Sequence, residues 1–306
     1  MKRYLVIRSL QSLLALLAIS VIAFAMSHLT GSPVDAMLPD DAGPEEAARL
    51  TKLWGLDRPL YEQYFVFLGN ALQGNFGDSI KWQGQTAFGL VLERLPATIQ
   101  LGGFAIVVST LIALPVGVLA AVYKDTPFDS AGKLVALLGQ AMPNFWLGIV
   151  LIWIFAVHLN WLPTSGRGGF RHMILPAIAM GWFQVAAFMR LTRSAMLEVL
   201  DSEYIKLARI KGVPERRVIW VHALKNAAIA PLTYFGVIAG SIFTGSVVIE
   251  TVFAWPGTGL LAIDAIRGRD FPVIQAVVVT FAGVFILANL IVDTLYAYLD
   301  PRIRYQ

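Results

Sequence analysis

Cysteine is absent from this 306-residue chain, and charge is scarce, since only 14% of the residues are Asp, Glu, Lys or Arg. Without cysteine the chain can form no disulfide, thiol nucleophile or thiolate metal site. A soluble domain carries roughly 25% charged residues, so this chain lacks the polar surface of a water-facing globule. Disorder and nucleic-acid binding through a solvated basic face need more charge still. The sequence therefore indicates a membrane protein with no nucleic-acid partner.

Apolar residues are abundant instead, at 57% of the chain, and the mean hydropathy is +0.66. A helix needs about 20 apolar residues to cross a bilayer. The first such run is longer than the apolar region of a signal peptide and no small-x-small cleavage site follows it, so we expect a retained helix. We predict an all-α polytopic membrane protein with six transmembrane helices, at residues 10–28, 98–123, 134–158, 173–190, 228–249 and 273–298.

The distribution of Lys and Arg predicts the orientation. With both termini in the cytoplasm, fifteen of the 24 cations fall in short inner segments, eight of them in residues 190–226. The positive-inside rule then places the N- and C-termini on the cytoplasmic side. The long outer segment, residues 29–97, reads as a small cap with helices after Pro44 and Pro59, because a separate domain of about 70 residues would have a thin core. We therefore divide the chain into 1–97, the first helix plus cap, and 98–306, a five-helix core.

Sequence motifs for catalysis are missing. The chain has no G-x-x-x-x-G-K-[ST], H-E-x-x-H or G-x-S-x-G, and its four histidines are scattered. We therefore expect no catalytic residue, metal site or cofactor in this chain. Within the predicted spans the main ionisable residue is Asp293, which speaks against a proton-driven carrier, because such carriers place acids or histidines at membrane depth.

Neutral polar residues do occur within the predicted spans. Buried amides and hydroxyls either bond across helices or line a wet path, and the sequence leaves both readings open. The candidates for a translocation path are Gln140, Asn144, Gln184, Ser241 and Thr244.

The segment 190–226 is the most polar part of the inner side. Helical spacing places Tyr204, Leu207 and Ala208 on one face, and Gly212 and Pro214 end the helix. Such a helix beyond the membrane surface could be the binding site for a partner protein. A basic loop resting on anionic membrane lipid is the alternative, and composition alone does not decide between them.

Motifs along the chain carry a family resemblance. The stretch Tyr204-Ile205-x-x-Ala208-Arg209-x-Lys211-Gly212-Val213-Pro214 resembles the EAA-type coupling loop of ABC importer permeases of the dipeptide, oligopeptide and nickel class. Further marks of that family are Gly55-Leu56-Asp57-Arg58-Pro59-Leu60, Gly74-Asn75-Phe76-Gly77-Asp78-Ser79, Arg94-Leu95-Pro96-Ala97-Thr98, Pro143-Asn144-Phe145-Trp146, the run from Gly245 to Gly257, Arg269-Asp270-Phe271-Pro272 and Asp300-Pro301-Arg302. The chain resembles the first of the two permeases of such a system.

The resemblance implies a fold, partners and a substrate class. It implies a type I importer permease in the inner membrane of a prokaryote, with a second homologous permease, two ATPase subunits that bind ATP and Mg, and an extracytoplasmic substrate-binding protein. Peptide is the first choice of substrate, with nickel chelates and sugars as alternatives. The residues that would contact an ATPase are Tyr204, Ala208, Arg209, Lys211 and Gly212.

Two positions depart from the family pattern. Lys206 stands where the generic motif has Glu, so no acidic role is carried to it, and Asn75 stands where Asp is common. Two other classes of protein are alternatives. An ion-coupled secondary carrier would need an internal repeat and midplane ion ligands, and a membrane-embedded enzyme would need a converging nucleophile and base.

Overall fold

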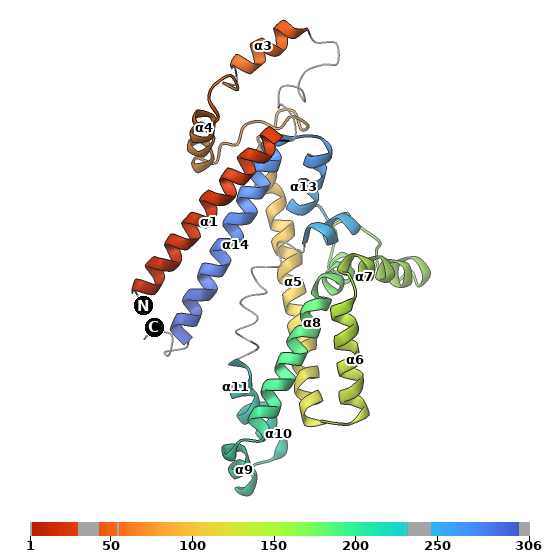
Figure 1. Cartoon of the computed structure of the whole chain (residues 1–306). Helices are drawn as coiled ribbons and strands as arrows, with labels where there is room; N and C mark the ends of the chain where they lie inside the picture. The colour runs from red at the N-terminus through yellow and green to blue at the C-terminus, as the bar shows by residue number, and fades with distance from the viewer. Residues whose placement is uncertain (1, 30–42, 54, 230, 232–245, 300–306) are drawn as a thin grey trace. The chain divides into compact units, whose positions relative to one another are not determined.

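The computed structural model describes residues 2–29, 43–53, 55–229, 231 and 246–299 (Figure 1). Over these residues it is helical apart from turns, loops and one isolated bridge between Asp78 and Thr86, so the all-α prediction is confirmed. The helices are α1 Lys2–Leu29, α3 Pro44–Leu53, α4 Leu60–Leu72, α5 Ala87–Val122, α6 Pro127–Ala141, α7 Asn144–Leu151, η1 Ile152–His158, α8 Arg171–Leu200, α9 Glu203–Ile210, α10 Glu215–Arg217, η2 Val218–Ala223, α11 Leu224–Ala227, α13 Thr258–Arg267 and α14 Phe271–Leu299; η1 and η2 are π-helical.

Within the described residues, four helices are long and apolar enough to cross a membrane, namely α1, α5, α8 and α14. A bent helix pair, if it is one span, brings the number there to five. The predicted runs 10–28, 98–123, 173–190 and 273–298 fall on these four helices, with α5 starting earlier and α8 ending later than expected. The predicted run 228–249 lies largely outside the described residues. The count of six spans is therefore not confirmed over the part of the chain that the structure describes.

The predicted span at 134–158 is not a single straight helix. The chain bends by 108° between α6 and the α7–η1 helix. Proline has no N–H group and forces the preceding residue out of the helical region, and Met142 before Pro143 is extended, with φ −86° and ψ 130°. Helix α6 therefore ends at Ala141, and α7 begins after Pro143 in a new direction.

Two compact units make up the chain. The first combines residues 1–98 with 256–306, and the second is residues 99–255. In the first unit α1 packs along α14 (Figure 1), and a core joins the start of α5 to α13 and α14. The loop before α5 is fixed to this core, because the buried carboxylate of Asp270 accepts bonds from the Ser79 hydroxyl (2.5 Å) and the Lys81 amide (3.0 Å). As predicted, helices follow Pro44 and Pro59, and Tyr64 of α4 bonds Ser20 of α1 at 2.9 Å.

The second unit centres on α6 packed against α8, with the later part of α5 beside them. Small residues permit the close contact. A Cβ added at Gly139 of α6 would lie 2.9 Å from the Trp182 side chain of α8, so only glycine fits without a shift. The side chains between these helices form an apolar cluster of Ala113, Ala136, Val185, Ala186, Phe188 and Met189.

Candidate functional site

Helix α9 follows α8 after a two-residue turn, and its buried side chain Ile205 anchors it. Ile205 is fully buried and packs into a cluster that includes Val118 of α5, Met196 of α8 and Val218 of η2. Burying such a side chain contributes roughly 1.5–3 kcal/mol relative to leaving it in water. The short helix is therefore fixed to the ends of two candidate spans.

The opposite side of α9 is apolar and uncovered. Leu207 is 51% exposed and Ile210 is 81% exposed, while Tyr204 is 43% exposed and its hydroxyl accepts a bond from the Asn226 amide at 2.8 Å. Ala208 instead packs against the cluster around Ile205. The predicted grouping of Tyr204 with Leu207 therefore describes an exposed surface, whereas Ala208 lies toward the interior. We call Tyr204, Leu207 and Ile210 the α9 face.

A glycine ends α9 and turns the chain. Gly212 has φ +76°, a left-handed conformation that glycine adopts without a Cβ clash, and a Cβ built there meets nothing within 4 Å. Its amide donates to the Arg209 carbonyl (2.9 Å), and the Val213 amide donates to the Ala208 carbonyl (3.2 Å). The predicted helix end at Gly212 is confirmed, and the neighbouring Lys211 is exposed.

An ion pair closes this turn. The Arg209 guanidinium binds both carboxylate oxygens of Glu215, at 2.7 and 3.2 Å. The bonded guanidinium lowers the pKa of Glu215 below its ordinary value of 4.5. A carboxyl group whose pKa is lowered in the folded protein stabilises the fold at every pH above the pKa that it has in the unfolded chain. This contribution is lost as the pH falls through the lowered, folded-state pKa. The ion pair between Arg209 of α9 and Glu215 of α10 is therefore fully formed at neutral pH.

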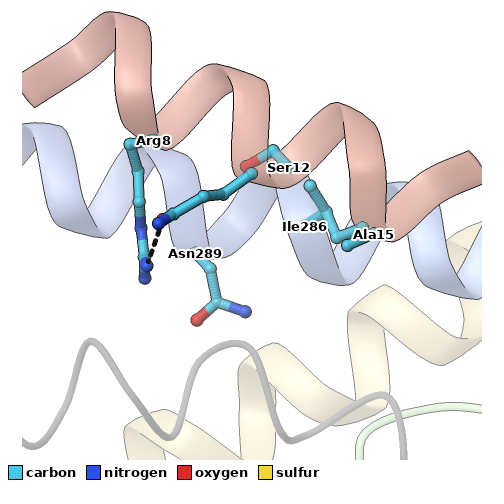
Figure 2. Close-up of a pocket in the computed structure, with 6 residues that line it drawn as sticks. Arg8, Ser12, Ala15, Ile286 and Asn289 are labelled. Carbon is cyan, nitrogen blue, oxygen red and sulfur yellow. Dashed lines mark hydrogen bonds between the residues drawn. The ribbon is translucent and has the colours of Figure 1, made fainter. Parts of the chain in front are cut away.

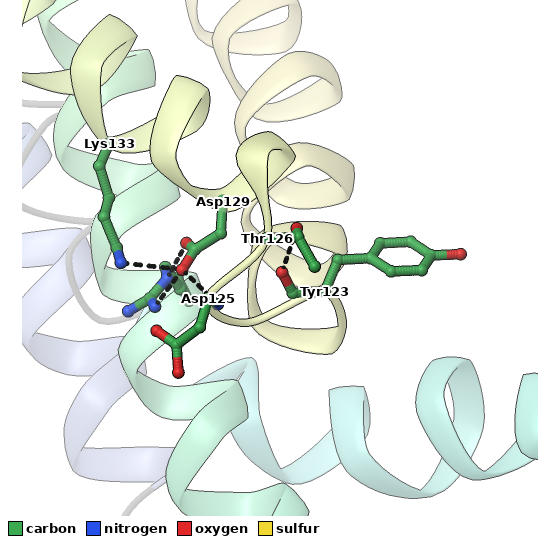
Figure 3. Close-up of polar contacts among 6 residues, drawn as sticks. Tyr123, Asp125, Thr126, Asp129 and Lys133 are labelled. Carbon is green, nitrogen blue, oxygen red and sulfur yellow. Dashed lines mark hydrogen bonds and ion pairs between the residues drawn. The ribbon is translucent and has the colours of Figure 1, made fainter.

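A second ionic site joins α6 to α8 (Figure 3). The Asp129 carboxylate is fully buried and accepts two bonds from Arg193 of α8, at 2.6 and 2.8 Å. Lys133 lies one helical turn further on, 2.8 Å away, and the Asp125 amide donates at 3.1 Å. Arg193 lies on the last turns of α8, eight residues before Asp201, where α8 leads into α9.

Sequence reasoning missed this site, which we call the Asp129 clamp. The sequence contains one indication of the site. Asp129 and Lys133 are four residues apart at the start of a helix, and an acid followed by a base at this spacing pairs favourably. The decisive partner, Arg193, is 64 residues away in the sequence. Only the packing of α6 on α8 brings it to the carboxylate.

The five path candidates are scattered in the described structure. Gln140 is the last residue but one of α6, and its side-chain oxygen accepts a bond from Arg190 of α8 at 2.8 Å. Asn144 is the first residue of α7, beyond the bend, and Gln184 is half-buried on α8. No hydrogen bond among these three side chains occurs in the described structure. Ser241 and Thr244 lie outside the described residues.

Metal chemistry finds no support in residues 2–29, 43–53, 55–229, 231 and 246–299. No three or more His, Asp or Glu side chains gather there in a way that could hold a metal ion. The ionisable clusters described above are ion pairs between opposite charges, which hold helices together and carry no reactive group. This arrangement defines a polytopic helical protein whose polar chemistry is concentrated in helix contacts and in the segment around α9.

Comparison with known proteins identifies the family. Residues 113–305 match the binding-protein-dependent transport system inner membrane component, and residues 1–102 match the N-terminal part of that membrane component. The chain belongs to this family of multi-pass inner-membrane permeases. It is a permease subunit of an ABC importer and not an enzyme, so the readings as a secondary carrier or membrane-embedded enzyme are wrong. A binding-protein-dependent system implies a partner permease, an ATPase that binds the ATP, and a substrate-binding protein.

Curated relatives match along nearly the whole chain. The oligopeptide transport system permease protein AppB of Bacillus subtilis is 38% identical over 316 residues, covering 100% of both chains. The di/tripeptide transport system permease protein DppB of Pseudomonas aeruginosa is 40% identical over 318 residues, covering 94% of both chains. The glutathione transport system permease protein GsiC of Escherichia coli is 38% identical over 311 residues, covering 100% of both chains. The resemblance read from the sequence motifs is confirmed.

Proposed function

We propose that this chain forms half of the translocation path for di- or oligopeptides. The observation that carries the proposal is the end-to-end identity of 38–40% to permeases whose names specify oligopeptides, di/tripeptides or glutathione. All three names specify short peptides, so they favour peptide over the nickel chelates and sugars that the sequence left open.

The α9 face and the turn at Gly212 are proposed as the contact with an ATPase. Two features support the assignment: the face is apolar and uncovered, and Ile205 on its other side connects it to the ends of α5 and α8. Tyr204, Arg209, Lys211 and Gly212 lie on or beside this surface, and Ala208 supports it from within. With both termini in the cytoplasm, as the distribution of Lys and Arg favours, α9 faces the compartment that contains ATP.

The mechanism we propose is alternating access driven from outside the chain. Two ATPase subunits close on ATP and Mg, α9 moves with one of them, and the spans tilt so that the path opens first outward and then inward. The Asp129 clamp makes the start of α6 follow the end of α8. A second homologous permease supplies the other half of the path, and an extracytoplasmic binding protein delivers the peptide.

Other parts of the sequence-based account stay predictions. The path residues remain Gln140, Asn144, Gln184, Ser241 and Thr244. The division into residues 1–97 and 98–306, with the coupling loop at 190–226, also stays a prediction. Contact of the chain with membrane lipid stays one as well.

An uptake experiment tests the peptide assignment. In the native cell, deleting the gene should reduce uptake of a labelled dipeptide supplied at low concentration to the background rate, and a plasmid copy should restore it. Uptake should persist when a protonophore collapses the proton gradient while ATP is held constant, because ATP drives the partner ATPases. Nickel and sugar uptake in the same deletion strain serve as controls and should not change. Loss of nickel or sugar uptake with normal dipeptide uptake would contradict the assignment.

A further inference from the structure

One apolar surface of the cap is uncovered. Helix α4, Leu60–Leu72, contains only one charged residue, Glu62. Tyr61, Phe65 and Leu72 of this helix are 64%, 66% and 82% exposed. At about 100° per residue they lie on one side of the helix, within an arc of about 40°. We call these three residues the α4 stripe. An exposed group of large apolar side chains indicates a surface that contacts a membrane or another protein.

Helix α4 packs against α1 through a different side. The hydroxyl groups of Tyr64 and Ser20 are hydrogen-bonded at 2.9 Å. The ring of Phe24 lies 5.6 Å from the ring of Tyr64 and 5.8 Å from the ring of Phe67. Tyr64 and Phe67 are on average roughly 110° around the helix axis from the α4 stripe. The stripe is therefore not used in the contact with α1.

The contact with α4 lies within the apolar run of α1. Ser20 and Phe24 belong to that run, which continues beyond both of them in the sequence to Met26. Helix α4 therefore lies alongside the candidate membrane-spanning part of α1 and not beyond its end.

Most of the apolar surface of α1 is left exposed by its described neighbours. Nearer its N-terminal end, Ser12 of α1 lines a pocket together with Asn289 of α14 (Figure 2). Only 11% of the apolar window of α1 is buried, and Val21 and Ile22, next to the contact with α4, are 47% and 55% exposed. Exposed apolar side chains of a membrane-spanning helix face lipid. The α4 stripe therefore adjoins a lipid-facing surface.

The remaining side of α4 is polar. Glu62 and Asn70 are exposed and lie outside the arcs of both the α4 stripe and the contact with α1. The Tyr61 hydroxyl donates to the Glu62 carboxylate at 3.5 Å, so the polar tip of this stripe residue lies toward the polar side. Helices that lie in a membrane interface have one apolar and one polar side, and tyrosine rings are enriched at the level of the headgroups.

We propose that the α4 stripe is embedded in the membrane interface, so that α4 anchors the cap to lipid. Two observations select lipid as the occupant. The stripe adjoins the exposed apolar surface of α1, and it lies alongside a membrane-spanning helix, where a soluble binding protein does not reach. Burying the stripe in lipid removes apolar surface from water, which favours this position of the helix. Under the proposed orientation the lipid belongs to the outer leaflet.

Spin labels on α4 test the proposal in the assembled importer. The chain has no cysteine, so Tyr61→Cys, Phe65→Cys and Leu72→Cys each place one nitroxide label on the stripe when the partner subunits are also free of cysteine. The importer is reconstituted, without its binding protein, in vesicles of phosphatidylethanolamine and phosphatidylglycerol. Collisions of the label with oxygen report exposure to lipid, and collisions with a charged nickel chelate report exposure to water. We expect the ratio of oxygen to nickel collisions at these positions to be several-fold higher than on the polar side of α4.

Matched controls come from the same helix. Glu62→Cys and Asn70→Cys place the label at exposed positions on the polar side of α4, and Ile22→Cys on α1 gives the ratio for a label in lipid. Three separate stripe positions keep the test decisive if one variant fails to assemble. Stripe ratios as low as those of Glu62→Cys and Asn70→Cys would show that the stripe faces water and would overturn the proposal. Few collisions with either reagent would show that a protein subunit covers the stripe, which would overturn lipid as its occupant.

Discussion

Replacing Gly212 by valine is expected to reduce the substrate-stimulated ATPase activity of the assembled importer, while the chain still inserts into the membrane. The left-handed backbone at this position (φ +76°) costs a residue with a Cβ about 1–2 kcal/mol, and a β-branched side chain more. Because nothing lies within 4 Å of the added Cβ, the effect comes from the backbone alone. A cost of about 1–2 kcal/mol on the conformation of α9 that contacts the ATPase lowers the population of that conformation about 5–30-fold. The measurement is ATP hydrolysis with and without the peptide-loaded binding protein.

Gly212→Asn is the matched control. Asparagine visits the left-handed region more readily than other residues with a side chain, so this variant should retain most of the stimulation. The amount of each variant in the membrane fraction separates poor insertion from poor coupling. Stimulation of Gly212→Val at the level of the unmodified chain, with equal amounts in the membrane, would remove the turn from the coupling mechanism.

Replacing Asp129 by asparagine is expected to destabilise the helix pair α6–α8 strongly. The carboxylate is fully buried, and its loss leaves the Arg193 guanidinium, only 18% exposed, without its carboxylate. Removing one partner of a buried ion pair typically costs about 3–5 kcal/mol. Lys133 is half exposed and adds little, because solvent screens it. Thermal unfolding in detergent, followed by tryptophan fluorescence, should show a clearly lower midpoint.

Asp125→Asn provides the control for Asp129→Asn, four residues earlier in the turn that precedes α6 (Figure 3). Only the backbone amide of Asp125 contacts Asp129, and that amide is kept. Asn also tolerates the positive φ of +61° found at this residue, and only a long-range attraction between the Asp125 carboxylate and Arg193 is lost, so the unfolding midpoint should fall far less than for Asp129→Asn. The double variant Asp129→Leu with Arg193→Leu should recover much of the stability, since it leaves no unpaired buried charge. A midpoint for Asp129→Asn equal to that of Asp125→Asn would show that the clamp is not needed.

The coupling segment was accessible to sequence reasoning because its signals are local. The helix stop at Gly212 depends on residues next to each other in the chain, and the exposed Leu207 shares a helical face with Tyr204 at the spacing of one turn. Ala208 shows the limit of such reasoning. Its position on the same turn of helix gave no indication that it packs inward, which depends on the distant Val118 and Met196.

The spans show where hydropathy succeeds and where it fails. Long apolar runs correspond to α1, α5, α8 and α14, because hydropathy reports length and composition. Hydropathy does not report the direction of the helix axis, so the apolar run 134–158 gave no indication of the 108° bend at Pro143. The buried clamp was missed for a related reason, since the pairing of Asp129 with Arg193 exists only after α6 and α8 have packed.

Crosslinking from the α9 face tests the central claim most directly. The chain has no cysteine, so Ile210→Cys introduces the only thiol in this chain, at a position 81% exposed, and a photoreactive maleimide can be attached there. Leu72→Cys is the matched control, because Leu72 of α4 is equally exposed, at 82%. We expect the Ile210→Cys probe to crosslink an ATPase that carries a phosphate-binding loop motif, and the Leu72→Cys probe to leave that subunit unlabelled. Crosslinking of the ATPase from position 72 and not from position 210, in complexes that transport peptide, would contradict the account.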